Sequence, residues 1–309
     1  MLLLLVGSDA QGQPRPVQER RFSVEEGSTL KLDTFVGAIK VTPTTESNEI
    51  IVRISIEATG GKPGAADRWM DDVAISTDQR DGTVSVVVRH RGGSVSVDLG
   101  EKPTGIVRFD LSVPASTHLD LTTRSGSIEV GHDLEGEVRA RAIFGSMFFG
   151  RMLGKVDAQV DDGDLTVSRA SGTVSLKTLR GDIDVGTLIS PATLETASGN
   201  ISIFSAERSI NAKASAGNIN ATLSAALAED SVLATSGGDI RVAVSPSSNL
   251  SIRARSVWGK IIMRLPIQTT AGGTGQRKLE GSINQGGSQL NLNASGGNIT
   301  MTAADSADS

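Results

Sequence analysis

The sequence predicts an all-β fold: a parallel β-solenoid, similar to a β-roll or β-helix, with about 18–21 residues and two short strands per coil. A glycine followed two places later by an apolar residue recurs every 18 residues from Gly145 to Gly217. Between the major glycines from Gly126 to Gly181 lie Gly136, Gly154 and Gly172, so the finer interval is nine residues. Self-similarity at a fixed interval indicates stacked copies of one small unit.

The major repeat glycines are expected to be structural turn residues. Tight reversals often need a positive φ, which glycine adopts without the steric cost of a Cβ. These residues are Gly37, Gly126, Gly145, Gly163, Gly181, Gly199, Gly217, Gly238, Gly259 and Gly297.

Apolar and polar residues alternate on both sides of each glycine, which is the period of a β-strand. Around Gly181, Val174 and Leu176 come before the turn, and Ile183 and Val185 come after it. Such a strand pair buries one face and cannot form a core alone, so we expect the coils to stack, each pairing in parallel with the coils before and after it in the sequence. Aromatic residues make up 3% of the chain, which favours a thin aliphatic interior.

The N-terminal part is less regular. Residues 1–19 are interpreted as a partial signal-like segment and linker, because the apolar run Met1–Val6 precedes small residues that could be cleaved after Ala10 or Gly12. This favours an extracytoplasmic protein (periplasmic, cell-surface or secreted). The alternative, a frayed apolar N-terminus of a cytoplasmic protein, stays open. With no cysteine, the chain has no disulfide framework and no lipid-accepting thiol.

Residues 20–115 are predicted to form a β-rich cap that continues into the solenoid. The segment contains one matching coil at 30–41, alternating runs at 50–56, 84–88 and 107–113, and a helical turn at 65–70. Residues 116–302 are the predicted solenoid repeats, interrupted by an irregular hairpin or loop at 266–289. The acidic, small-residue tail at 303–309 is expected to be disordered.

Several short motifs carry a resemblance to a known family. Gly-Ala-Ile-Lys-Val at 37–41 and Val-Pro-Ala at 113–115 precede repeated Ser-Gly-Ser-Ile-Glu-Val, Arg-Gly-Asp-Ile-Asp-Val and Ser-Gly-Asn-Ile-Ser-Ile. Over residues 20–302 the chain resembles the DUF4097 family of β-strand-repeat proteins, often labelled "putative adhesins". The resemblance implies a bacterial, extracytoplasmic β-solenoid, and it supplies no catalytic residue.

The position after the glycine is the most suggestive column. Asp164, Asp182, Asn200 and Asn218 stand 18 residues apart and should stack. One interpretation is a cation site or a carboxylate pair, since clustered oxygens bind calcium and paired carboxylates hydrolyse glycosidic bonds. The favoured interpretation is structural, because Asp and Asn are preferred turn residues and stacked Asn side chains form amide ladders.

Other function classes lack their usual signals. A net charge of −5 disfavours nucleic acid, for which a basic stripe is typical. His90, His118 and His132 have no helical metal spacing, and no cofactor motif is present. Exposed aromatic side chains, which carbohydrate platforms usually need, are scarce: Trp69, Trp258 and seven phenylalanines. We therefore expect no catalytic, cofactor-binding or metal residues.

The predicted function is a non-enzymatic, exported β-solenoid that acts as a structural or adhesin-like interaction module of the bacterial envelope. Its partner would be an unknown protein or cell-surface component, and the sequence contains no transmembrane segment. One alternative is a polysaccharide-active β-helix enzyme that uses the acidic cluster of Asp161, Asp162, Asp164, Asp182 and Asp184. Another is a regulatory envelope protein that binds another protein.

Overall fold

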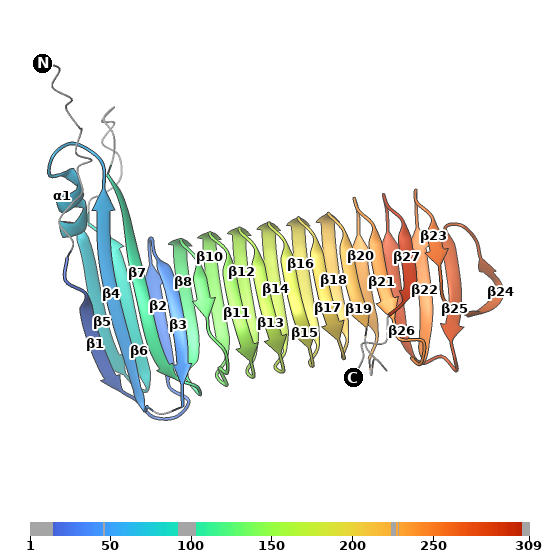
Figure 1. Ribbon diagram of the computed structural model, residues 1–309, viewed down its shortest axis with the longest axis horizontal. Coiled ribbons are helices and arrows are strands. Elements are labelled where there is room, and N and C mark those ends of the chain that lie inside the picture. The colour runs from blue at the N-terminus through green and yellow to red at the C-terminus, as the bar shows by residue number, and fades with distance from the viewer. Residues whose placement is uncertain (1–14, 46, 92–102, 224–226, 228, 305–309) are drawn as a thin grey trace, which may run out of the picture.

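The protein is a long stack of β-coils with two facing sheets (Figure 1). The computed structural model describes residues 15–45, 47–91, 103–223, 227 and 229–304. Sheet A contains 13 strands and sheet B contains 14, and aliphatic side chains from both inner faces form one core. The predicted β-solenoid is confirmed. The apolar run Met1–Val6, its expected cleavage sites and residues 305–309 lie outside the described residues.

In the regular part, each coil contributes one strand to sheet B and the next to sheet A. The sheet B strands are β8 (His118–Ser125), β10 (Val138–Phe144), β12 (Val156–Asp162), β14 (Val174–Arg180), β16 (Ala192–Ser198), β18 (Ile210–Ala216) and β20 (Ser231–Thr235). The sheet A strands are β9 (Ile128–Val130), β11 (Met147–Met152), β13 (Leu165–Ala170), β15 (Ile183–Leu188), β17 (Ile201–Ala206), β19 (Ile219–Leu223) and β21 (Ile240–Val244).

Equivalent positions of neighbouring coils stack in register. Val174 of β14 pairs with Val156 of β12, and Ile183 of β15 pairs with Ile201 of β17. The pairing is parallel, so one inward position generates a column of aliphatic side chains along the stack. All four of these side chains are buried. Successive side chains of a strand point to opposite faces of the sheet, so the outward positions form equally regular columns on the surface.

The turn glycines have a second reason to be glycine besides their dihedral angles. Gly181 has a φ of 146° and Gly199 a φ of 151°, where side chains are strained. A Cβ at Gly181 would also collide with the carbonyl oxygen of Gly163, and one at Gly199 with that of Gly181. The turns therefore stack at a distance that leaves no room for a side chain.

The N-terminal region adds strands beyond the first regular coil. Its elements are β1 (Gln18–Ser23), β2 (Thr29–Thr34), β3 (Ala38–Thr44), β4 (Glu49–Thr59), α1 (Ala65–Asp71), β5 (Val73–Arg80), β6 (Thr83–His90) and β7 (Thr104–Pro114). The coil of β2 and β3 lies between β8–β9 on one side and β6–β7 on the other, with parallel pairing throughout. Outside it, β4, β1 and β5 pair in antiparallel fashion. β1 begins at Gln18, inside the stretch expected to be a linker, because its backbone pairs with β4.

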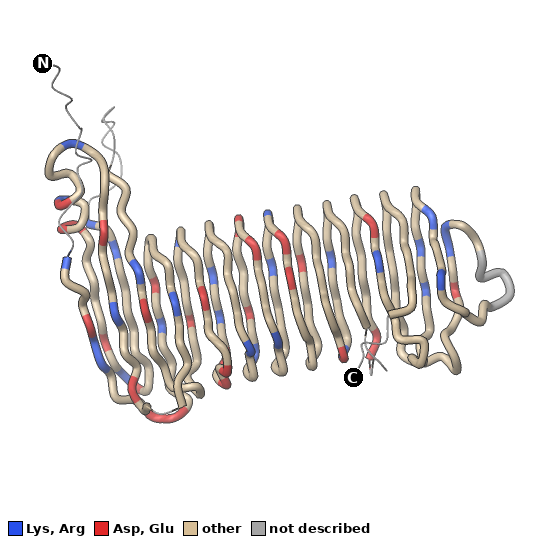
Figure 2. The backbone as a smooth tube through the Cα atoms, viewed as in Figure 1, with Lys and Arg blue, Asp and Glu red and all other residues tan. Residues whose placement is uncertain are grey.

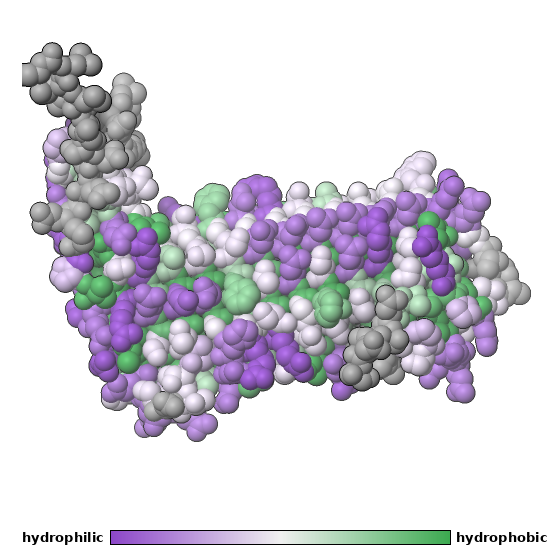
Figure 3. Space-filling model, viewed as in Figure 1, coloured by the Kyte–Doolittle hydropathy of each residue, from purple (hydrophilic) through white to green (hydrophobic). Residues whose placement is uncertain are grey.

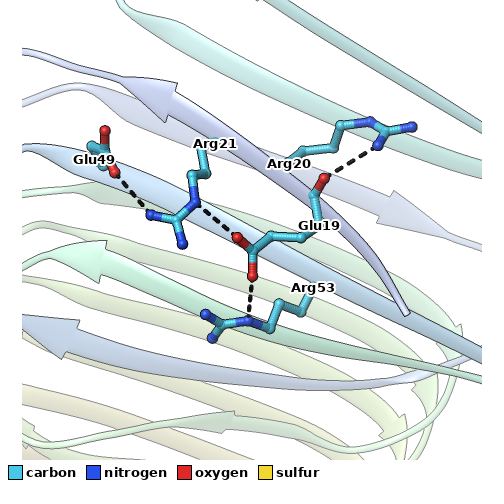
Figure 4. Close-up of polar contacts among 5 residues, drawn as sticks. All are labelled: Glu19, Arg20, Arg21, Glu49 and Arg53. Carbon is cyan, nitrogen blue, oxygen red and sulfur yellow. Dashed lines mark hydrogen bonds and ion pairs between the residues drawn. The ribbon is translucent and has the colours of Figure 1, made fainter. Parts of the chain in front are cut away.

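Charged residues are frequent in these N-terminal strands (Figure 2). On the edge strand β1, Glu19 accepts hydrogen bonds from Arg21 Nε at 2.7 Å and from Arg53 Nε at 2.8 Å (Figure 4). The two arginines, Arg21 first, lower the pKa of Glu19. A charged edge strand resists pairing with another sheet edge.

The C-terminal coil is inserted rather than added at the end. The last six strands are β22 (Leu250–Ser256), β23 (Ile261–Met263), β24 (Gln268–Thr274), β25 (Lys278–Ile283), β26 (Ser288–Ala294) and β27 (Ile299–Ala303), of which β26 and β27 form the last coil. β26 pairs with both β20 and β22, and β27 with both β21 and β23. The expectation that each coil pairs with its neighbours in sequence is therefore wrong here.

The expected irregular loop at 266–289 contains the antiparallel pair β24–β25, and β25 covers β22 at the end of sheet B. Placing the last coil inside the stack leaves this hairpin as the outer part of sheet B, where it protects β22 from pairing with another sheet edge. β27 extends to Ala303, one residue into the expected disordered tail, and the amide of Ala304 donates to the carbonyl of Val244 at 2.9 Å. The described chain has no helix long and apolar enough to cross a membrane.

Candidate functional site

The Asp and Asn column lies along the turns that lead from sheet B into sheet A. Asp164 Oδ1 accepts the backbone N–H of Asp182 at 2.9 Å, and Asp182 Oδ1 accepts that of Asn200 at 2.7 Å. Asn200 Oδ1 accepts the N–H of Asn218 at 3.0 Å. The same contact continues through Asp239 and Asn298 to Lys260. Each side chain thus joins its turn to the next coil. This structural role explains why Asp and Asn recur at this position without a metal or catalytic role.

The acidic cluster does not form one site. Asp161 and Asp162 end β12, and Asp162 is paired with Arg180, whose Nη2 lies 2.9 Å from the carboxylate. Asp164 and Asp182 belong to the turn column. Asp184 lies on the exposed outer face of β15, away from the turn. Among the residues that the structure describes, no three His, Cys, Asp or Glu side chains are grouped so as to hold a metal ion.

The three histidines occupy separate structural positions. Nδ1 of His118 accepts the N–H of Glu137 at 3.0 Å, and Nδ1 of His132 accepts the N–H of Arg151 at 3.1 Å. The His90 ring lies 5.2 Å from the Trp69 ring, under α1. Trp69 in turn fills the space above Gly105, where a Cβ would collide with the indole.

A groove lies on the outer face of sheet A. It has a volume of about 640 Å³ and crosses β13, β15, β17, β19, β21 and β27. Two outward rows line it. One row consists of Thr166, Asp184, Ser202, Asn220, Arg241 and Thr300; the other consists of Ser168, Gly186, Phe204, Thr222, Ala243 and Thr302. At about 4.8 Å between strands, the groove extends roughly 24 Å along the stack.

The groove exists because most of its outward side chains are short, and Phe204 is the large side chain in a row of small residues. Phe204 is 78% exposed, the largest fraction among the large hydrophobic side chains described. Its neighbour on β15 is Gly186, where a Cβ would collide with the carbonyl oxygen of Ser168. On β19, whose register with β17 shifts between Ile203 and Ala206, the groove is lined at this place by Thr222. The Phe204 ring therefore stands in the groove between the small residues Gly186 and Thr222 of the two neighbouring strands.

A second exposed aromatic side chain lies at the end of the groove. Phe148 of β11 is 37% exposed and pairs in register with Thr166 of β13. Phe149, Met147 and Met152 of the same strand are buried in the core. Figure 3 shows a face of the solenoid on which hydrophobic residues form a band along the long axis, with hydrophilic residues on both sides.

Three polar residues in the groove are free to bind. Asp184, Ser202 and Asn220 occupy consecutive places in one row, in register across β15, β17 and β19. Within the described part of the chain, no hydrogen bond or ion pair engages these side chains. On the outer face of sheet B, by contrast, Lys177 pairs with Glu195 at 3.5 Å.

Sequence reasoning missed Phe204. The aromatic residues were weighed by their number, which is small, and not by their place in the repeat. A usable signal exists: the fifth position after the turn glycine is Ser168, Gly186 and Thr222 in nearby coils, and phenylalanine only at 204. A bulky apolar residue in a row of small outward ones is exposed by necessity.

Comparison with solved structures finds matches at low identity. A protein described as a "putative adhesin" from Bacteroides fragilis is 13% identical, covers 93% of this chain and 98% of its own, and has a TM-score of 0.43. A "putative lipid binding protein" from Parabacteroides distasonis is 13% identical, covers 93% of this chain and 96% of its own, and has a TM-score of 0.49. No protein of curated function matches. The family model described as Toastrack DUF4097 matches residues 30–302, and the chain therefore belongs to the DUF4097 family.

Proposed function

We propose that this protein is a non-enzymatic interaction module of the bacterial envelope, and that the groove on the outer face of sheet A is its binding surface. The observation that carries the proposal is the row of Asp184, Ser202 and Asn220 beside the exposed Phe204. Pockets of this size, with an apolar contact and a few convergent polar groups, are typical of binding sites.

The distribution of acidic residues supports binding over catalysis. Asp162 is held by Arg180, and Asp164 and Asp182 hold backbone amides of neighbouring coils. Asp184 alone among them faces the groove. Glycoside hydrolysis uses two carboxyl groups that flank the scissile bond, which one groove carboxylate does not supply. The location outside the cytoplasm is part of the proposal and is what the family resemblance implies.

A surface-binding assay tests this function. Labelled full-length protein is incubated with isolated envelope material from the bacterium that encodes it, alongside Thr222→Arg, which fills the groove, and Thr193→Arg, which places the same side chain on the outer face of sheet B. We expect saturable binding that Thr222→Arg reduces and Thr193→Arg preserves. Absence of binding, or equal loss in both variants, would contradict the proposal.

A further inference from the structure

We infer that the groove on sheet A binds a linear, uncharged glycan chain, which lies along the solenoid axis and stacks a sugar ring on Phe204. This assignment rests on the proposed function, because it names the ligand class of the same groove. The ligand class is inferred from the side chains that line the groove: the aromatic ring of Phe204, the hydroxyl of Ser202, the amide of Asn220 and the carboxylate of Asp184.

The repeat spacing suits a polymer of small rings. Each strand offers one side chain per row, about 4.8 Å from the next, so the groove repeats the same contact opportunities along its whole length. Phe148 and Phe204 lie in neighbouring rows on β11 and β17, three strand intervals apart, which is roughly 14 Å along the stack. A chain of pyranose rings presents apolar C–H faces at regular intervals and can contact both aromatic rings at once.

The polar groups match hydroxyls. Ser202 and Asn220 can each donate and accept, and the Asp184 carboxylate accepts only. These three side chains lie on the strands at and beside Phe204, with no partner in the described chain. Sugar hydroxyls donate and accept in every direction around the ring, so they can satisfy this mixed set while one ring face rests on the phenyl group.

Charge favours an uncharged chain over an anionic one. The Asp184 carboxylate repels anions, and the one cation in the lining, Arg241, is already paired with Asp239 at 2.8 Å. A uronic acid or phosphate-bearing polymer would gain no free positive charge in this groove.

A peptide fits the groove less well. An added β-strand needs a free sheet edge, and the groove lies on a sheet face whose backbone is paired on both sides, as for β17 with β15 and β19. A docked helix needs an apolar groove with anchors along its length. Here the outward side chains between Phe148 and Phe204 are short or polar and supply no regularly spaced apolar anchors, so a peptide is an outcome of the test and not the assigned ligand.

The first experiment measures binding of three neutral hexasaccharides, cellohexaose, chitohexaose and mannohexaose, to the full-length protein by saturation-transfer NMR and titration calorimetry. We expect at least one to bind, and to bind more tightly than its monosaccharide. Phe204→Ala should weaken that binding about tenfold, the cost of losing one aromatic stack. Asn220→Ala should weaken it by a smaller factor.

Phe144→Ala is the matched control, because Phe144 is 50% exposed but ends β10, outside the groove. It should bind like the wild type. Binding by none of the hexasaccharides, or equal binding by wild type and Phe204→Ala, would overturn the glycan assignment.

Treatment of the envelope material separates this inference from the proposed function. Periodate, which cleaves the vicinal 2,3-diols of 1,4-linked glucose and mannose chains, or chitinase, which cleaves N-acetylglucosamine chains that lack such a diol, should abolish the binding that Thr222→Arg reduces, and protease should leave it intact. The reverse result would overturn the glycan while keeping the groove as the binding surface. Equal binding of envelope material by Thr222→Arg and Thr193→Arg would contradict both the glycan ligand and the groove as the binding surface.

Discussion

The carboxylate of Asp182 accepts the backbone N–H of Asn200, 18 residues ahead in the chain, at 2.7 Å. The Asn200 side chain then accepts the N–H of Asn218 in the same way. Either Asp or Asn can occupy this column, because in both residues a single side-chain oxygen accepts the backbone N–H of the next coil. The column that most resembled a metal or catalytic site in the sequence is a seam between turns.

We therefore expect Asp182→Ala to lower the free energy of unfolding by about 1 kcal/mol, since it leaves the Asn200 amide without its acceptor. Asp182→Asn retains that oxygen and should change stability by less than about 0.5 kcal/mol. Asp184→Ala, two residues away on the exposed face, is the control and should also be nearly neutral. Urea unfolding measures all three, and an Asp182→Asn loss equal to that of Asp182→Ala would show that the charge matters.

The stacked turns make a second prediction. Gly181→Ala faces both a strained φ of 146° and the carbonyl of Gly163. Gly82 has a φ of 70° with open space around its Cβ position, so Gly82→Ala carries only the dihedral cost. We expect Gly181→Ala to be the more destabilising by roughly 2 kcal/mol, a typical cost of local strain. Similar melting temperatures for the two variants would argue against the close stacking of turns.

The insertion of the last coil can be tested by disulfide formation, since the chain has no cysteine of its own. Ala234 of β20 pairs with Asn293 of β26, which pairs with Arg255 of β22. Ala234→Cys with Asn293→Cys should therefore oxidise to a disulfide. Ala234→Cys with Arg255→Cys places the thiols two strands apart, about 9.6 Å, too far for a bond. If the coils stacked in sequence order, the second pair would be the one to oxidise.

Acid should weaken the N-terminal cap. Arg108, whose Nη1 lies 2.6 Å from Glu57 Oε1, lowers the pKa of Glu57 below its ordinary value of 4.5. A lowered pKa means that the ionised carboxylate stabilises the fold above the unfolded pKa, and that this contribution is lost as the pH falls through the folded pKa. Glu57→Gln should melt below the wild type at pH 7, and the difference should shrink as the pH falls below 4.5. A difference that stays constant as the pH falls would contradict the ion pair as its cause.

The fold could be predicted from the sequence because two patterns agree. The 18-residue glycine spacing predicts repeated turns, and the alternation of apolar and polar residues predicts strands between those turns. The order of the terminal coils could not. Leu290 and Leu292 have the same pattern as every other coil, so the pattern favours stacking but does not distinguish one neighbour from another. Their place between β20 and β22 depends on the fit of whole coils and on how the ends are covered.

The groove was equally hard to predict, because its residues are ordinary outward positions of the repeat. Ser168, Gly186 and Thr222 are unremarkable one at a time, and only their stacking in register turns three small side chains into a depression. The Asp column was the opposite case. Its residues were conspicuous in the sequence, and the structure assigns them to backbone hydrogen bonds.

The claim that sheet A is the binding face is tested most directly by a fluorophore placed on it. Arg169→Cys and Thr193→Cys give single labelling sites in a chain without cysteine, one exposed on β13 next to the groove residue Ser168 and one on the outer face of sheet B. On titration with solubilised envelope material, an environment-sensitive label at residue 169 should change its emission in a saturable way, and the label at residue 193 should not. A change at residue 193 with none at 169 would contradict the assignment of the groove as the binding surface.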